Sequence, residues 1–363
     1  QKIVSITTDK LCDLYIKEEQ RHLTDIPKQG ITSGTLMNKK KHLSKWKEFI
    51  AGLHLASVAI DRIDPSKIDG DAFGRWLLAR PQSKQYEGRP RSRDAVNGTI
   101  SQIRRMYKFA VKKRLLGAAQ VPALDYLKIQ DDGKHKRDIL TNEEYERLWR
   151  WMQDKWCRGR ILQRYDKQAK EWIPCDADAP GAQWKRDPAI TEEQLRRRIC
   201  FEKIIGIMTN VGARVKEYQG LRCKDITVTN HPDPDIRARC LTLEITAANS
   251  KTGKGRRIVA PIRKRIDVIR EIYDQCGFEH HLDPNSDALF FIDPKDGKPW
   301  TQRKWRLLLD EVLVGSGLKT GSPSDKKLNL YFARHQYATY RLRAGVDRGL
   351  LAKNMGTSML QLE

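Results

Sequence analysis

Residues 331–339 of this 363-residue chain read Tyr-Phe-Ala-Arg-His-Gln-Tyr-Ala-Thr. Two shorter stretches that precede them also contain basic residues. The first is Gly-Ala-Arg-Val-Lys-Glu at 212–217, where Asn-Val-Gly ends a predicted helix. The second is Ser-Lys-Thr-Gly at 250–253, in the tip of a predicted β-hairpin. The basic residues of interest in these stretches are Arg214, Lys251 and Arg334.

Two arginines and a lysine suit a phosphoryl transfer that uses no metal. A phosphodiester under attack becomes a five-coordinate, dianion-like species, and two guanidinium groups can each bind its non-bridging oxygens through paired hydrogen bonds. Positive charge that is positioned before the reaction stabilises this species far more than the same charge in water. A lysine on a hairpin can reach the leaving oxygen and donate a proton to it.

Taken singly, each of these residues has a more ordinary explanation. Arg214 alone fits a salt bridge at a helix end, and Lys251 alone fits a hairpin-tip lysine in contact with solvent. Arg334 with His335 fits a surface pair. The inference therefore depends on the order and spacing of the three stretches together.

In this order and spacing, the three stretches resemble the tyrosine recombinase (phage-type integrase) family. The resemblance covers the chain from about Leu140 to its end. Gly-Ala-Arg-Val-Lys-Glu resembles the family's first-arginine motif, Ser-Lys-Thr-Gly its hairpin lysine, and Ala-Arg-His-Gln-Tyr-Ala-Thr its second-arginine motif. The N-terminal helical part is similar to the family's core-binding domain.

The resemblance implies a role for each matching residue. Arg214 and Arg334 would hold the scissile phosphate, and Lys251 would protonate the leaving 5′ oxygen. Glu217 stands at the family's usual acidic position and would orient Arg214. The nucleophile would be a tyrosine near the C-terminus that forms a 3′-phosphotyrosyl bond. Because this bond stores the energy of the cut, rejoining needs no ATP.

The sequence departs from the family pattern at three places. Tyr331 stands where the first histidine is usual, and a phenol is a poor base at neutral pH. Thr357 stands where a histidine or tryptophan is usual, and threonine keeps a hydrogen-bond donor without an imidazole. His335 is a further candidate for the general-base step, although a histidine after the arginine is more often a packing residue. The nucleophilic tyrosine is expected just beyond Glu363, because 359–362 already begins the helix that leads to it.

The chain carries a formal net charge of +23, and a soluble protein this basic usually binds a polyanion. Residues 1–130 hold 25 Lys and Arg against 13 Asp and Glu, and the remaining residues hold 44 against 33. Both halves are therefore expected to bind the same nucleic acid. A merely soluble surface, or binding to anionic lipid or ribosomal RNA, is the alternative that charge alone leaves open.

Two amphipathic helices with basic outer faces are predicted in the N-terminal part, at about 35–50 and 94–114. Their apolar stripes consist of Leu36, Leu43, Trp46 and Ile50 in the first helix and of Val96, Ile100, Ile103, Tyr107 and Ala110 in the second. Two such helices in one small domain favour contact with phosphates over a solvated surface. The residues predicted to bind DNA are Lys39, Lys40, Lys41, Lys45, Arg104, Arg105, Lys108 and Lys112, with Lys254 and Arg256 on the hairpin.

The charged stretch 129–138 is predicted to link a helical domain at 5–128 to a catalytic domain at 139–363. The catalytic domain should begin with a helix capped by Thr141 and Glu144. Residues 154–190 show no clean period and are expected to be an insertion or a long ordered loop. Strands are predicted at 240–247 and 256–260, and further helices at 192–209, 262–275, 301–314 and 328–343.

Seven scattered cysteines without CxxC spacing disfavour a disulfide framework and a zinc site, and they fit a reducing cytoplasm. No carboxylate or histidine cluster suggests a metal site, and no cofactor is expected. No run of about 18 apolar residues is present. We therefore expect a cytoplasmic, nucleoid-associated protein of bacterial or phage origin that does not associate with membranes.

The expected fold is mainly α with a small β-sheet, in two domains that form a C-shaped clamp on double-stranded DNA. The resemblance implies site-specific recombination that integrates or excises a mobile element, by a homo-tetramer and with accessory DNA-bending proteins as possible partners. Three alternatives stay open: a catalytically inactive DNA-binding relative, a type IB topoisomerase-like enzyme, and a basic RNA-binding protein. The last of these gives the arginine pair no role.

Overall fold

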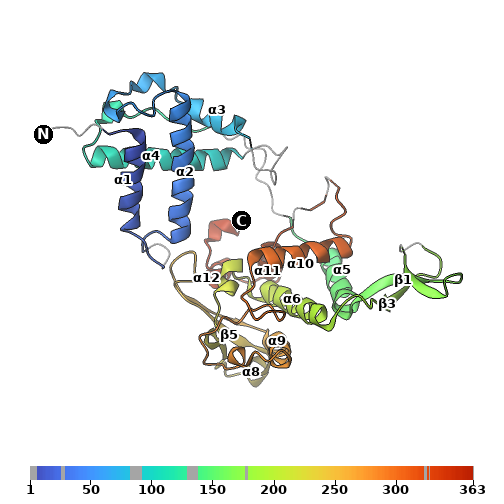
Figure 1. Ribbon diagram of the computed structural model, residues 1–363. Coiled ribbons are helices and arrows are strands. Elements are labelled where there is room, and N and C mark those ends of the chain that lie inside the picture. Colours follow the sequence, from blue (N-terminus) through green and yellow to red (C-terminus); the bar gives the residue numbers. More distant parts are fainter. Residues whose placement is uncertain are drawn as a thin grey trace. The chain divides into compact units, whose positions relative to one another are not determined.

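The computed structural model describes residues 6–25, 29–81, 92–128, 138–175, 179–322, 325–326 and 328–362. The chain divides into two compact units, Gln1–His135 and Lys136–Glu363 (Figure 1). The boundary lies within the stretch 129–138 that was predicted as a linker, of which 129–137 fall outside the described residues.

The described part of unit 1 is built from four α-helices joined by turns (Figure 1). The helix α2 packs on all three of the others. The helices are α1 (Thr8–Gln20), α2 (Ser33–Gly52), α3 (Ala72–Ala79) and α4 (Arg93–Lys112), and 3-10 turns lie at Ile60–Arg62, Pro65–Lys67 and Ala118–Gln120.

Both predicted apolar stripes of unit 1 are confirmed, because every residue in them is buried. The Trp46 ring lies at the centre, edge-on to the Phe73 ring with centroids 4.8 Å apart. The Tyr107 ring meets Trp46 from α4 at 6.0 Å. Aromatic side chains thus join α2, α3 and α4 around one core.

The expectation that all the lysines of α2 lie on exposed faces is wrong for Lys39. This side chain is buried, with its ammonium 2.6 Å from the Glu19 carboxylate of α1 and 5.6 Å from the centre of the Tyr15 ring. The pairing residue comes from another helix, so the sequence of α2 alone does not reveal it. Lys39 therefore joins α2 to α1 and is not available to bind DNA.

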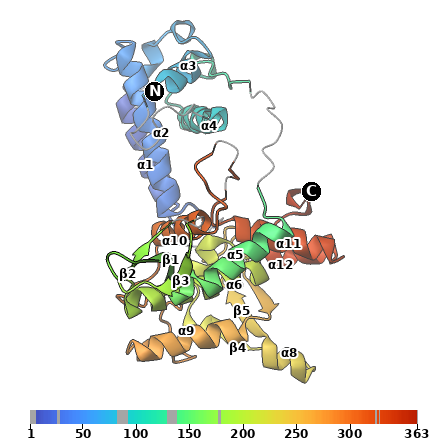
Figure 2. The same cartoon turned by 90° about the vertical axis from the view of Figure 1, so that its right-hand side faces the viewer.

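Unit 2 is mainly helical and contains two small antiparallel sheets in its described part (Figures 1 and 2). Its helices are α5 (Asn142–Asp154), α6 (Glu192–Val211), α7 (Val215–Gln219), α8 (Pro234–Arg239), α9 (Arg263–Gln275), α10 (Gln302–Gly315), α11 (Phe332–Arg343) and α12 (Arg348–Met355), with 3-10 turns at Trp156–Arg158, Cys223–Asp225, Glu279–His281 and Met359–Gln361. The mainly α fold with a small β component is thereby confirmed.

The predicted hairpin is confirmed as β5 (Leu241–Ile245) and β6 (Arg256–Ala260), which pair antiparallel with Leu243 opposite Ile258. A third strand that the sequence did not reveal, β4 (Ile226–Val228), extends this sheet to the order β4-β5-β6. It spans three residues, which is too short to show an alternating pattern.

Residues 154–190 were expected to be an insertion or a long ordered loop, and the structure contradicts the second of these alternatives. The chain forms a second sheet of order β2-β1-β3, from β1 (Arg160–Asp166), β2 (Glu171–Pro174) and β3 (Gln183–Arg186). Most side chains of β2 and β3 are exposed on both faces, so these strands lack the alternation of buried and exposed residues that identifies a half-buried strand.

The helix α6 runs through the core of unit 2, where it packs against α9 and α11 (Figure 2). Its residues from Cys200 onward are buried almost all round, as expected of a central helix. The helix α11 is fixed to the start of the unit by Gln336, whose fully buried amide makes hydrogen bonds of 3.0 and 3.1 Å with the N–H and C=O of Leu140. The predicted capping box of Thr141 and Glu144 is confirmed at α5.

Two predicted helix boundaries differ from the structure. The helix expected at 328–343 begins at Phe332, with Tyr331 as its N-cap residue. The expected helix at 359–362 is a single 3-10 turn, Met359–Gln361.

Gly212 ends α6 in the left-handed conformation, with φ +67°, and a Cβ atom there would lie 2.2 Å from the Tyr337 ring of α11. We expect Gly212→Ala to lower the free energy of unfolding by about 2–5 kcal/mol, since backbone strain and overpacking add. The control is Gly345→Ala, because Gly345 has φ +77° and no neighbour within 4 Å of a Cβ atom. It should cost only about 1 kcal/mol for strain. Equal losses in urea titrations of both variants would contradict the packing role.

Candidate active site: an arginine cluster around Glu217

The end of α6 delivers Arg214 to the site through a tight turn. After Gly212 the chain leaves the helix, and the Ala213 N–H donates to the Tyr218 hydroxyl at 3.1 Å. Arg214 is then the N-cap residue of α7, and its N–H donates to Glu217 Oε2 at 2.6 Å. The motif Gly-Ala-Arg-Val-Lys-Glu is therefore a helix end, a turn and a helix start that bring an arginine and a glutamate together.

The Arg214 side chain is largely buried and donates two hydrogen bonds. Its Nη1 lies 3.0 Å from Glu217 Oε1, and its Nη2 lies 2.5 Å from the Gly356 carbonyl oxygen. Glu217 is fully buried. One carboxylate thus fixes both the backbone and the guanidinium of Arg214.

Arg334 reaches the same place from α11. It is buried, and its Nη1 donates to the carbonyl oxygens of Gly212 at 2.6 Å and Met355 at 2.9 Å. Burial, together with the positive charge of Arg214, lowers the pKa of Arg334 to about 10. Its Nε and Nη2 atoms make no hydrogen bond to any residue that the structure describes.

Arg256 was predicted to bind DNA, and the structure corrects this. The side chain is mostly buried and holds both oxygens of Glu217 with its Nη1 and Nη2 atoms, at 3.0 and 2.7 Å. Its Nε donates to the Asn354 carbonyl oxygen at 2.8 Å. A signal for this was present in the sequence, because Arg256 is in phase with the buried Ile258 and Ala260 on alternate positions of β6.

The C-terminal end of α12 connects the three arginines. The carbonyl oxygens of three consecutive residues, Asn354, Met355 and Gly356, accept hydrogen bonds from Arg256, Arg334 and Arg214 respectively. A helix C-terminus carries partial negative charge and unpaired carbonyl groups, so guanidinium groups are favourable there. The stretch Met-Gly-Thr-Ser at 355–358, which contains the predicted site residue Thr357, is therefore fixed beside the arginine pair.

The cluster of Arg214, Arg256, Arg334 and Glu217 carries an excess of two positive charges. Burial alone would raise the pKa of Glu217, but hydrogen bonds from Arg256 and Arg214 and their positive charges hold it below its ordinary value. Glu217 therefore stays ionised at neutral pH. A buried excess of positive charge is costly to desolvate and is relieved by an anion.

The structure places Lys251 in the loop between β5 and β6. Asn249 anchors this loop through Nδ2, which donates to the Gly220 carbonyl oxygen at 2.7 Å, and Ser250 is fully buried. Lys251 and Lys254 are exposed, and neither makes a hydrogen bond or ion pair with a described residue. The arginine pair is thus brought together, whereas Lys251 makes no contact with it.

Tyr331, His335 and Thr357, the other predicted catalytic residues, lie near the ends of α11 and α12. Tyr331 is half-buried at the N-cap of α11, and the His335 N–H donates to its carbonyl oxygen at 3.1 Å. Thr357 follows Gly356, and its N–H donates to the Ala352 carbonyl oxygen at 3.0 Å. His335 and Thr357 are both half-buried and interact with neighbouring residues.

The remaining predicted DNA-binding residues lie on α2 and α4 of unit 1. Lys45 is half-buried and interacts with neighbouring residues. The guanidinium of Arg104 stacks on the Tyr126 ring at 4.9 Å. The side chains of Lys40, Lys41, Arg104, Arg105, Lys108 and Lys112 are exposed.

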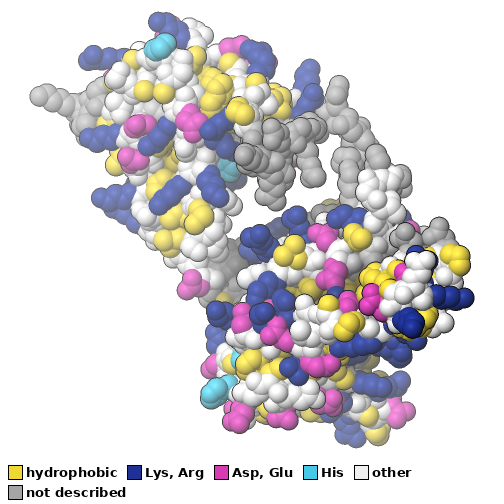
Figure 3. All heavy atoms as spheres, turned by 45° about the vertical axis from the view of Figure 1, so that its right-hand side comes forward, with side chains coloured by type: hydrophobic (Ala, Val, Ile, Leu, Met, Phe, Trp, Pro, Cys, Tyr) yellow, Lys and Arg dark blue, Asp and Glu magenta, His cyan; other side chains and the backbone are white. Residues whose placement is uncertain are grey.

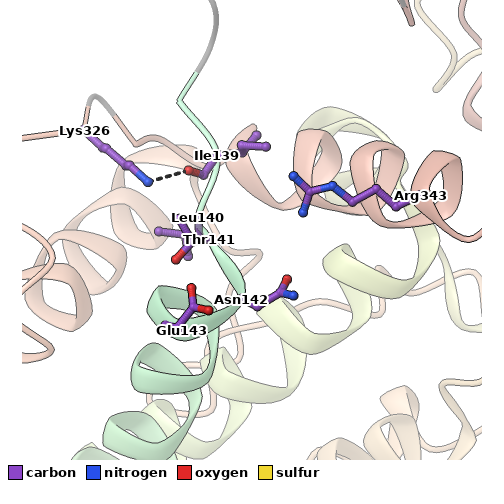
Figure 4. A pocket seen from close by; sticks show the side chains of 7 residues that line it. All are labelled: Ile139, Leu140, Thr141, Asn142, Glu143, Lys326 and Arg343. Atoms are coloured by element: carbon purple, nitrogen blue, oxygen red, sulfur yellow. Dashed lines mark hydrogen bonds between the residues drawn. The ribbon is translucent and has the colours of Figure 1, made fainter.

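A cavity of about 370 Å³ opens at the start of α5 (Figure 4). It is lined by residues 139–143 with Lys326 and Arg343, and Lys326 Nζ donates to the Ile139 carbonyl oxygen at 2.9 Å. None of the predicted site residues lines it. We therefore assign the candidate site to the arginine cluster.

Among the described residues, no group of three or more His, Cys, Asp or Glu side chains is arranged to hold a metal ion. None of the described helices has both the length and the apolar character needed to span a bilayer.

Comparison with known proteins gives a fold but no family assignment from sequence. The sequence matches no protein-family model and no curated protein. Among solved structures, the chain is similar to a lambda integrase dimer bound to a COC′ core site, with a TM-score of 0.58 and 13% identity over 99% of this chain and 77% of that one. It is also similar to XerH site-specific recombinase bound to a palindromic difH substrate, with a TM-score of 0.56 and 17% identity over 98% of this chain and 80% of that one.

A third similar structure is the Tn1549 transposon integrase in complex with transposon right end DNA. Its TM-score is 0.56, with 13% identity over 98% of this chain and 93% of that one. The fold is that of site-specific recombinases. At such low identity the likeness establishes the fold, and the chemistry has to be argued from the site itself.

The buried Glu217 predicts how stability depends on pH. Its folded-state pKa is depressed, so it stabilises the fold above the unfolded value near 4.5, and this stabilisation is lost as the pH falls through the lower folded value. We expect Glu217→Gln to lower the free energy of unfolding at pH 7 by about 3 kcal/mol, because it leaves two buried guanidinium groups without a charged partner. The variant should lose less stability than the wild type between pH 5 and pH 3.

Urea titrations across that range measure the effect. The matched control is Glu244→Gln, because Glu244 is exposed on β5 and pairs with Arg257 only at 3.7 Å. If the free energy of unfolding falls equally between pH 5 and pH 3 in the wild type and in Glu217→Gln, the Glu217 carboxylate does not carry this stabilisation.

Proposed function

We propose that the protein is a tyrosine-type site-specific DNA recombinase, which cuts and rejoins duplex DNA through a 3′-phosphotyrosyl intermediate. The observation that carries this proposal is the buried arginine cluster around Glu217, with its excess of two positive charges. The five-coordinate phosphorus species formed during phosphoryl transfer carries about two negative charges. Its charge therefore complements the cluster.

Arg214 and Arg334 would bind the scissile phosphate directly. The Nε and Nη2 atoms of Arg334 and the Nε atom of Arg214 make no hydrogen bond to a described residue. These N–H groups can donate hydrogen bonds to the non-bridging oxygens of the phosphate, while the other guanidinium nitrogens keep their hydrogen bonds to described residues. Arg256 would be a positioning residue, because it contacts Glu217 and through it fixes Arg214.

In the proposed reaction, the oxygen of a tyrosine attacks phosphorus and the bond from phosphorus to the 5′ oxygen breaks. Lys251 would give its proton to the departing 5′ oxygen. The exposure of the Lys251 side chain, which makes no hydrogen bond or ion pair with a described residue, supports this role, because its ammonium group is accessible to DNA. His335 would take the proton of the attacking tyrosine, and Tyr331 and Thr357 would donate hydrogen bonds to phosphate oxygens. Rejoining is the reverse attack by a 5′ hydroxyl group, so the cycle needs neither ATP nor a metal.

The proposed partner is double-stranded DNA at recombination sites, which a homo-tetramer of this chain would bind. Both units carry a large excess of Lys and Arg, which supports the DNA partner. A similar structure, with a TM-score of 0.55 and 14% identity, is a lambda integrase tetramer bound to a Holliday junction. Integration or excision of a mobile element is the proposed biological outcome, and DNA-bending proteins are the proposed accessory partners.

Cleavage can be tested by incubating the full-length protein with nicked duplexes that carry candidate attachment sites. We expect a covalent protein–DNA adduct on a denaturing gel. Arg214→Gln and Arg334→Gln should each reduce adduct formation by about 10²–10³-fold, the usual cost of removing one positioned donor to a transition-state oxygen.

Lys216→Gln is the matched control, since Lys216 is exposed on α7 two residues from Arg214. It should leave the adduct yield unchanged. Tight DNA binding without an adduct on any site would instead favour a DNA-binding protein without recombinase activity. Adducts that form with no preference for sequence, together with relaxation of supercoils, would favour a type IB topoisomerase.

The excess charge of the cluster predicts that inorganic phosphate stabilises the protein. Bound phosphate at ten times its Kd should stabilise the folded state by about 1.4 kcal/mol, which is a rise in Tm of roughly 3–6 °C. The rise should disappear in Arg334→Gln and persist in Lys216→Gln. Thermal unfolding at constant ionic strength measures it, and an equal rise in all three proteins would point to a general salt effect.

A further inference from the structure

The sheet β2-β1-β3 has no role in the proposed chemistry. Its strands pack mainly against one another, and the sheet projects from the helices of unit 2 beyond α5 and α6 (Figures 1 and 2). A small sheet without a core beneath it is only marginally stable in water. Binding to a partner is a physical reason to retain such an element.

The strand register gathers arginines on one face of this sheet. Residues opposite one another in antiparallel strands share a face, and the pairs are Arg160 with Arg186 and Leu162 with Trp184. Arg164 lies on the same face, opposite Ile173 of β2. The ammonium of Lys155 lies 4.6 Å from the centre of the Trp184 ring. We refer to this surface as the arginine face; it consists of Lys155, Arg160, Arg164, Trp184 and Arg186.

Most charges of the arginine face lack a carboxylate partner. Arg186 pairs with Glu192 at 3.1 Å, but the side chains of Arg160 and Arg164 make no hydrogen bond or ion pair within the described residues. The acidic residues of this face, Asp166 and Glu171, lie at its outer end. Asp166 accepts hydrogen bonds from two backbone N–H groups of the adjoining turn, so its carboxylate is engaged there.

The opposite face differs in character. Lys185 lies over the Trp172 ring at 4.2 Å, and the Tyr165 ring meets Trp172 edge-on at 5.7 Å. On this face, the Lys185 ammonium and the two aromatic rings therefore interact with one another. Figure 3 brings the side of unit 2 that carries this sheet forward and shows Lys and Arg side chains next to hydrophobic ones.

Charged residues also protect the edges of a sheet against aggregation, which is the more ordinary explanation of Arg160 and Arg164. Protection of an edge requires charged residues, but it does not require that they gather on one face of the sheet around an exposed tryptophan. The Trp184 side chain at the centre of this face is 39% exposed. An exposed, flat apolar ring flanked by guanidinium groups has the composition of a surface that contacts sugars and phosphates.

We propose that the arginine face binds the phosphate backbone of the same duplex DNA as the arginine cluster, at a distance from the site of strand cleavage, because the 20-residue helix α6 separates the two. The proposal rests on the proposed function, since that function supplies the duplex. Arg160 and Arg164 are four residues apart on one strand, a span of about 13 Å, which corresponds to about four nucleotides of one DNA strand along the helix axis. Both guanidinium groups can therefore contact phosphates of the same DNA strand.

The test is the salt dependence of binding to a fluorescein-labelled, random-sequence duplex of about 40 base pairs, measured by anisotropy with the full chain. We compare the wild type with the double variant Arg160→Gln/Arg164→Gln. The slope of log K against log salt should fall by about 1.8, since each phosphate contact contributes about 0.9. Affinity at 0.15 M salt should fall on the order of tenfold.

The matched control is Arg237→Gln/Arg239→Gln, which removes the same charge from two exposed residues of α8. It should keep the wild-type slope, and Arg160→Lys/Arg164→Lys should keep most of it. Circular dichroism and Tm values show whether each variant still folds. If the glutamine variant does not fold, the lysine variant still tests the proposal.

Three outcomes would overturn the inference. If the glutamine variant and the control have the wild-type slope, the arginine face does not contact DNA, and the proposed function is unaffected. If both variants lower the slope equally, the effect is one of total charge. If sedimentation shows that the glutamine variant loses self-association while its slope is unchanged, the face binds a second copy of the chain. Failure of the wild type to bind any duplex would instead contradict the proposed function itself.

Discussion

The carboxylate of Glu217, held between Arg214 and Arg256, is the contact on which the rest of the site depends. A buried ion pair of this kind is weak evidence for stability, because two hydrophobic residues often serve as well. Here one carboxylate stands among three guanidinium groups, so charge balance is not achieved within the cluster. The carbonyl oxygens at the end of α12 supply further acceptors, and the partial negative charge of that helix end offsets part of the excess.

This arrangement couples parts of the chain that are far apart in sequence. The turn after α6, the strand β6 and the helices α11 and α12 meet through hydrogen bonds of the arginines, and each arginine comes from a different element. A phosphate that binds the unused N–H groups of Arg214 and Arg334 would therefore lie next to the hydrogen bonds that hold Gly356 and Met355. The chain beyond Gly356 begins at Thr357, so the position of the following segment is set by the same guanidinium groups that would hold the substrate.

The features that the sequence predicted are those in which local pattern and burial agree. The stripes around Trp46 and Tyr107, the capping box of Thr141 and the β5–β6 hairpin all have a periodic or capping signal that tertiary contacts reinforce. The errors have the opposite origin. Lys39 is buried because Glu19 of another helix pairs with it, and the sheet at 160–186 lacks alternation because both of its faces are largely exposed. Arg256 was predicted to bind DNA because the hairpin is basic in composition. Its position in β6, in phase with the buried Ile258 and Ala260, instead indicated a side chain that points inward.

The shared fold and the arginine cluster carry different weight. Structures that are 13–17% identical establish an architecture, and an architecture can hold an active enzyme or a protein that only binds DNA. The cluster is more informative because it is unfavourable without a ligand: burial and the charge of Arg214 depress the pKa of Arg334 to about 10. A protein that bound DNA only through its exposed lysines would have no need of two buried guanidinium groups held close together with unused donors. Their retention is understandable if an anion of about two charges occupies the space between them, which is what a phosphodiester becomes during its transfer.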